Sequence, residues 1–130
     1  MKWWQWRPDL LSREVSSMKN VSNARLELVD NHLAWVEWIT TNFGETYGVT
    51  IVYPNRYPKS PPQAFIIEPE IDDKAPHRFL DGSLCLFPPE DIYTNPNLKR
   101  AKHIRGLACF WLFCYTTYRE TGQWPAPSTH

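Results

Sequence analysis

The chain has 130 residues, of which 42% are hydrophobic and 22% are charged. This length and composition suit one domain, residues 1–130, with a hydrophobic core of its own, and they exclude a disordered chain. Fourteen Lys and Arg residues balance fourteen Asp and Glu residues, so we expect neither nucleic acid nor a membrane surface among the partners.

The start of the chain carries Lys2, three Trp residues and Arg7, with no apolar stretch of signal-peptide length. Nowhere does an uncharged run approach the roughly 18 residues that a membrane span needs. We therefore expect a cytoplasmic protein. Trp3, Trp4 and Trp6 are either a docking surface or a small addition to the core.

The first regular element that the pattern predicts is a short amphipathic helix over residues 8 to 20. Pro8 suits a first helical turn, and the apolar residues Leu11, Val15 and Met18 follow at helical spacing.

Alternation of apolar and polar residues then predicts an antiparallel meander of four strands. A turn at Asp30 and Asn31 joins the first two strands, and a break at Gly44 precedes the third. These strands cover residues 24–28, 33–39, 47–53 and 64–67.

The remaining connections are long and irregular. Residues 53–62 carry four prolines, which fix φ and remove backbone donors, so this segment runs extended outside the sheet ladder. Residues 68–97 show no sustained period, and an irregular connection of this length in a small domain favours a functional loop. A helix from about Ile104 to a stop at Gly122 completes an α+β domain.

Three cysteines without an export signal argue against a disulfide framework. Cys109 and Cys114 are five residues apart on the predicted helix and lie on different faces, so we predict no metal site and no cofactor. Cys114 shares a helical stripe with Trp111, which indicates a buried thiol. Cys85 lies in a Leu-Cys-Leu triplet of the long loop, and this pattern alone leaves open a nucleophile or a core residue.

Two motifs at matching spacing resemble the ubiquitin-conjugating (UBC) family. The segment Tyr57-Pro58-Lys59-Ser60-Pro61-Pro62 is similar to the family's Tyr-Pro-x-x-Pro-Pro signature. Pro76-His77 and Gly82-Ser83-Leu84-Cys85-Leu86 are similar to its His-Pro-Asn loop and Gly-x-Ile-Cys-Leu segment, with Ala75 in place of the histidine and His77 in place of the asparagine.

The resemblance covers residues of roughly 8 to 124, and its later part is similar to truncated bacterial relatives of antiphage defence operons of the CBASS type. Trp111-Leu112-Phe113-Cys114-Tyr115 and Thr121-Gly122-Gln123-Trp124 carry that part. The resemblance implies a UBC-like fold with an N-terminal helix, a four-stranded meander, an active-site loop and a C-terminal helix.

The same resemblance implies an enzyme that holds an acyl group on Cys85 as a thioester and transfers it to an amine. His77 would stabilise the oxyanion or only support the loop. Independently of the resemblance, Asp81, Glu90 and Asp91 flank Cys85 in sequence, and they either form a solvated loop face or include an acid that orients or deprotonates the amine, for which we select Asp91. The implied partners are an E1-like activating enzyme and either a ubiquitin-like modifier or the C-terminus of a cyclic-oligonucleotide synthase.

Two other functions compete with the conjugating enzyme. The loss of the family asparagine favours a catalytically inactive UBC-like binding module. A Cys-His hydrolase has weak support, because no residue near His77 in sequence is an evident orienting acid. His103, at the start of the last predicted helix, is expected to be an exposed residue.

Overall fold

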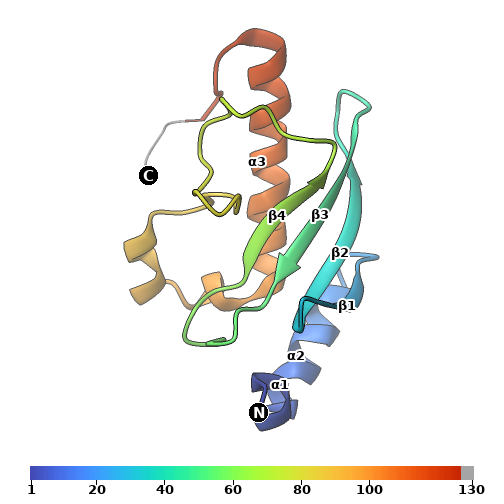
Figure 1. The fold of residues 1–130 in the computed structure, drawn as a ribbon, viewed down its shortest axis with the longest axis vertical. Coiled ribbons are helices and arrows are strands. Elements are labelled where there is room, and N and C mark those ends of the chain that lie inside the picture. Colours follow the sequence, from blue (N-terminus) through green and yellow to red (C-terminus); the bar gives the residue numbers. More distant parts are fainter. Residues whose placement is uncertain (127–130) are drawn as a thin grey trace.

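The computed structural model describes residues 1–126. They form an α+β architecture with an antiparallel four-stranded sheet and helices at both ends, as predicted (Figure 1). The elements in chain order are α1 (Trp3–Trp6), α2 (Pro8–Lys19), β1 (Arg25–Val29), β2 (His32–Thr40), β3 (Thr46–Val52), β4 (Gln63–Glu68), the 3-10 helices η1 (Pro89–Tyr93) and η2 (Pro96–Lys99), and α3 (Ala101–Thr121).

The sheet is a simple meander in which each strand pairs with its neighbour in sequence, in the order β1-β2-β3-β4. Asp30 and Asn31 have φ values of 49° and 65°. Two consecutive residues in the left-handed region give the tight turn that matches the twist of paired strands, and Asn and Asp tolerate this region better than most residues. The predicted hairpin turn is therefore confirmed.

The core lies between the sheet and α3, which runs along the sheet in Figure 1. Tyr47, Val49 and Ile51 of β3 are buried, as are Ile104 and Tyr115 of α3. The ring of Tyr47 meets that of Tyr115 edge to face, with centroids 6.2 Å apart. The apolar faces predicted for the third strand and the last helix thus pack against each other.

The N-terminal tryptophans divide between core and surface. Trp3 is buried, with its ring centroid 5.0 Å from that of Tyr53 and 4.7 Å from that of Tyr57. Trp6 is 69% exposed. The short helix α1, which the sequence pattern did not predict, positions Trp3 over the proline-rich connection.

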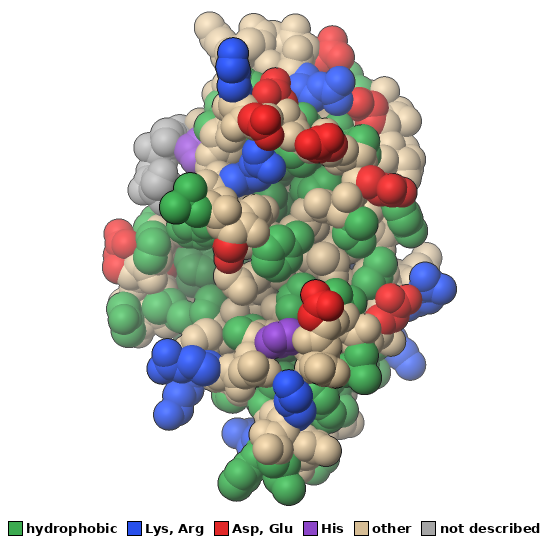
Figure 2. Space-filling view, in the orientation of Figure 1, with side chains coloured by type: hydrophobic (Ala, Val, Ile, Leu, Met, Phe, Trp, Pro, Cys, Tyr) green, Lys and Arg blue, Asp and Glu red, His purple; other side chains and the backbone are tan. Residues whose placement is uncertain are grey.

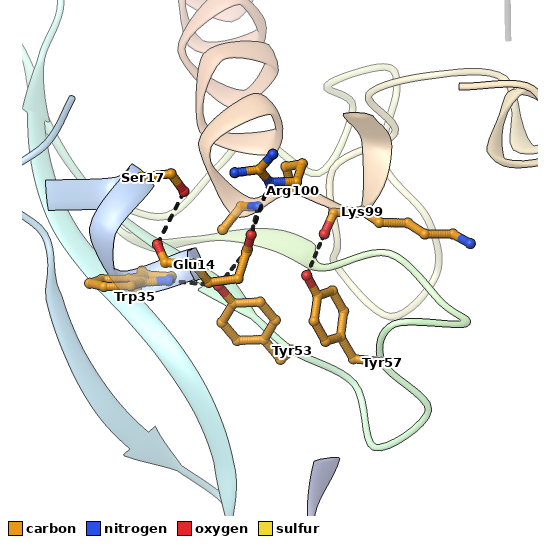
Figure 3. Close-up of polar contacts among 8 residues, drawn as sticks. Glu14, Ser17, Trp35, Tyr53, Tyr57, Lys99 and Arg100 are labelled. Atoms are coloured by element: carbon orange, nitrogen blue, oxygen red, sulfur yellow. Dashed lines mark hydrogen bonds and ion pairs between the residues drawn. The ribbon is translucent and has the colours of Figure 1, made fainter. Parts of the chain in front are cut away.

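A buried acid joins three distant parts of the chain (Figure 3). Glu14 of α2 is 0% exposed, and its carboxylate accepts hydrogen bonds from the Tyr53 hydroxyl at 2.9 Å, the Ala101 backbone N–H at 2.9 Å and Arg100 Nε at 3.2 Å. Burial raises the pKa of Tyr53, so its hydroxyl remains a donor. The network fixes α2 against the start of α3.

This network corrects the face predicted for the first helix. The fully buried residues of α2 are Leu10, Glu14 and Met18, whereas Leu11 and Val15 are only partly buried. The face of α2 that packs on the core therefore differs from the predicted face, and it includes the charged residue Glu14.

On the face shown in Figure 2, acidic and basic side chains are interspersed among apolar ones. Within residues 1–126, no helix combines the length and the apolar character needed to cross a membrane.

Candidate active site

A tight turn presents Cys85 next to His77. An isolated antiparallel bridge pairs Arg78 with Leu84, and Gly82 closes the turn with φ of 89°, a value that favours glycine. The Cys85 backbone N–H donates to the His77 carbonyl at 2.8 Å. Two residues that are eight positions apart in sequence are thus adjacent in space.

Asp81 has a structural role in this turn. Its Oδ1 atom accepts hydrogen bonds from the Ser83 backbone N–H at 2.9 Å and from the Ser83 hydroxyl at 2.6 Å. The hydrogen bond from the Ser83 hydroxyl is the largest cause of a lowered Asp81 pKa. Asp81 thus holds the turn, which leaves Glu90 and Asp91 as the acids to consider near the thiol.

His77 is held in a special backbone conformation from two sides. Its φ of 63° lies in the left-handed region, where Asn, Asp and His are enriched among non-glycine residues. Its carbonyl accepts a second hydrogen bond, from Trp111 Nε1 of α3 at 3.1 Å. Its imidazole lies against the Trp124 ring, with centroids 4.9 Å apart. This backbone conformation suits a histidine, and it would equally suit the asparagine that the resemblance leads us to expect at this position.

Cys85 and His77 line a cleft of about 430 Å³ between the loop and α3. Among residues 1–126, its other titratable side chains apart from Cys114 are Asp91 of η1 and His103 of α3. Most of the remaining wall is apolar, which is typical of ligand sites that carry only a few placed polar groups. The main apolar lining residues are Leu86, Leu98, Leu107, Phe110, Trp111 and Trp124.

A second, larger cleft of about 570 Å³ lies beside the end of α2 and Trp38. The carboxylate of Glu37 in this cleft forms an ion pair with Arg105, in which Arg105 Nε lies 2.8 Å from Glu37 Oε2. We favour the smaller cleft as the active site because it contains a thiol.

The structure brings together all three of the residues predicted for the site, Cys85, His77 and Asp91, on one cleft. Glu90 is exposed and does not contribute to the cleft wall formed by residues 1–126. His103, expected to be exposed, is half-buried and lines the cleft. Helical spacing could have indicated this, because His103, Leu107 and Phe110 fall at i, i+4 and i+7 on α3.

The three thiols differ in position. Burial raises the pKa of Cys85, Cys109 and Cys114 alike. Cys85 retains 9% exposure in the cleft, whereas Cys114 borders the same cleft with 0% exposure. Cys109 is half-buried on α3, outside the cleft wall described here. Access through the cleft therefore distinguishes Cys85.

We expect the reactivity of Cys85 to rise with pH through and beyond the ordinary thiol pKa of about 8.5, because the thiolate is the nucleophile and burial disfavours it. The measurement is the rate of alkylation of Cys85 by iodoacetamide against pH, in a Cys109→Ala/Cys114→Ala background. A cysteine-containing peptide is the reference thiol. A Cys85 profile that levels off at lower pH than the peptide would contradict the expectation.

Within residues 1–126, no group of His, Cys, Asp and Glu side chains is arranged to hold a metal ion. The cleft offers a thiol, imidazoles and a carboxylate among mostly apolar walls.

Comparison with protein families identifies the family of the chain. The family model described as Type II CBASS E2 protein matches residues 14–130, and the chain therefore belongs to this family. The match spans the sheet, the Cys85 turn and α3, and it confirms the bacterial E2-like branch expected from the motifs. The family acts in conjugation in bacterial antiphage defence. No curated protein matches the chain.

Proposed function

We propose that the protein is a conjugating enzyme that carries the C-terminus of a partner protein on Cys85 as a thioester and transfers it to an amine. The observation that supports this most directly is the cleft that Cys85 shares with His77 and Asp91. Membership in the CBASS E2 family supports the same reaction class.

In the loading step, the Cys85 thiolate attacks the carbonyl carbon of a thioester on an E1-like activating enzyme. A new C–S bond forms on Cys85, the C–S bond to the activating enzyme breaks, and the departing thiolate takes up a proton. Thiol–thioester exchange suits this site because sulfur is both a good nucleophile and a fair leaving group.

In the transfer step, an amine attacks the Cys85 thioester, a C–N bond forms, and the Cys85 thiolate leaves. His77 stabilises the oxyanion of the tetrahedral intermediate through a ring N–H, and Asp91 accepts the proton that the amine loses. Both side chains line the cleft that holds the reacting sulfur.

The acyl donor that we propose is the C-terminus of either a ubiquitin-like protein or a cyclic-oligonucleotide synthase, which the CBASS family suggests. The test combines the protein with an E1-like enzyme, ATP and each donor, followed by intact-mass measurement. We expect an adduct that hydroxylamine removes. Absence of an adduct with both donors, and with synthetic peptide thioesters, would contradict the proposal and favour a binding module.

We expect His77→Gly to leave loading of Cys85 nearly intact and to slow discharge to an amine by about 10²-fold, within the range for loss of one oxyanion donor. Glycine is chosen because it tolerates the φ of 63° that alanine does not. His77→Asn should recover much of the lost rate, since it keeps a donor and the backbone preference.

Single-turnover discharge of preloaded protein measures this effect. A role in loop support predicts instead that His77→Ala, which strains the backbone, slows both loading and discharge while His77→Gly slows neither. An unchanged discharge rate in His77→Gly would therefore remove the oxyanion role.

A further inference from the structure

The wall of the cleft that α3 provides is apolar and, at Phe110, exposed. Phe110 is 53% exposed, yet it lines the cleft beside Leu107 and Trp111. Trp124 closes the wall from the segment after α3, with its ring centroid 5.5 Å from that of Trp111. Exposed apolar surface of this kind is a mark of a binding site in a monomer.

The position of the Cys85 thiol indicates which molecule would bind against this wall. Any chain whose C-terminal carbonyl bonds to Cys85 must extend away from that atom through the space around it. The cleft of about 430 Å³ is of the size that holds a small organic ligand, so the residues just before the donor's C-terminus lie within it.

The charges in the cleft define which side chains fit. Among the residues that the structure describes, no Lys or Arg lines the cleft, and Asp91 is its one carboxylate. An acidic side chain placed against Phe110 and Trp124 would lose water without meeting a Lys or Arg of the cleft, and a basic one would gain a counter-ion only where it reaches Asp91. An apolar side chain gains from the same burial.

We propose that the Phe110 wall selects donor tails that carry a large apolar side chain within their last few residues. This inference rests on the proposed function, and it names Phe110 as a specificity-determining residue. A donor tail with a basic or acidic residue at that position is expected to load poorly.

The experiment uses two sets of short synthetic peptides that carry Leu, Lys or Glu at successive positions before a C-terminal glycine. One set consists of C-terminal thioesters, and the acylation rate of Cys85 is followed by intact mass. The other set consists of unreactive C-terminal amides, and the measurement is their protection of Cys85 from iodoacetamide. Both are done with the full chain carrying Cys109→Ala and Cys114→Ala.

We expect a Leu thioester to acylate Cys85 about 10-fold or more faster than its Lys or Glu counterparts at one position, within the range for a hydrophobic pocket. Phe110→Ala should remove most of this preference. Phe43→Ala is the matched control, because Phe43 is 50% exposed between β2 and β3 and lies outside the cleft wall formed by residues 1–126. Phe113 is unsuitable, since its ring stacks on that of Phe110 with centroids 6.2 Å apart.

Equal acylation rates for all peptides would overturn the selection of apolar tails while leaving thioester formation intact. Protection by the Leu amide, lost in Phe110→Ala, without any acylation would support the apolar site and overturn the proposed chemistry instead. The assignment of Phe110 would be overturned by the absence of both preference and protection. An effect of Phe43→Ala equal to that of Phe110→Ala would overturn it as well.

Discussion

Replacing Cys85 by alanine is expected to abolish the hydroxylamine-labile adduct completely, whereas Cys109→Ala and Cys114→Ala retain it. Cys85 alone combines a place on the cleft with measurable exposure, since Cys114 is 0% exposed and Cys109 lies outside the described cleft wall. Loss of the reacting sulfur removes the covalent step itself. Intact-mass measurement of each variant after incubation with the activating enzyme, donor and ATP gives the result.

Cys85→Ser sharpens this test. A serine oxygen is a poorer leaving group than sulfur, so any adduct on it should be an oxyester that resists reducing agent. An adduct in that variant that is still lost to reducing agent would place the carrier sulfur elsewhere. Melting curves of the variants show whether the fold is retained.

The largest effect on stability is expected at Glu14. Glu14→Ala leaves the Ala101 N–H and the Tyr53 hydroxyl without their acceptor and leaves Arg100 without its carboxylate. Removing one partner of a buried ion pair costs roughly 3 to 5 kcal/mol. We expect the lower end of this range, because the Arg100 side chain is 33% exposed and can regain water.

Urea denaturation measures the free energy of unfolding of this variant. Glu27→Ala is the matched control, since Glu27 pairs with Arg25 on the surface at 3.3 Å and such pairs contribute about 1 kcal/mol or less. Equal losses for the two variants would show that the Glu14 network contributes no more than a surface pair.

Most of the secondary structure could be predicted because its signals are local. The meander is encoded by alternation and by the Asp30-Asn31 turn, and α3 by an apolar stripe that ends at Gly122 with φ of 79°. The helix α1 was missed because four residues are too few to show a period. The burial of Glu14 was missed because a charged residue on a helix is ordinarily exposed.

Some residues of the candidate site could be predicted from local sequence, and others could not. Cys85, His77 and Asp91 were predicted from motifs in one loop and its flanks, and they line one cleft. The opposite wall depends on how α3 docks, which no local pattern specifies. Phe110, His103 and Trp124 reach the cleft only through that tertiary arrangement.

The Glu14 network also bears on the order in which the protein folds. Ala101 and Arg100 lie 87 and 86 residues beyond Glu14 in the chain, so the carboxylate gains these partners only after very large loops have closed. Until these loops close, the Glu14 carboxylate remains hydrated. Contacts that form after the rate-limiting barrier stabilise the native state alone, and they act by slowing unfolding rather than by speeding folding. If the Glu14 contacts form after that barrier, Glu14→Ala should raise the rate of unfolding and leave the rate of folding nearly unchanged.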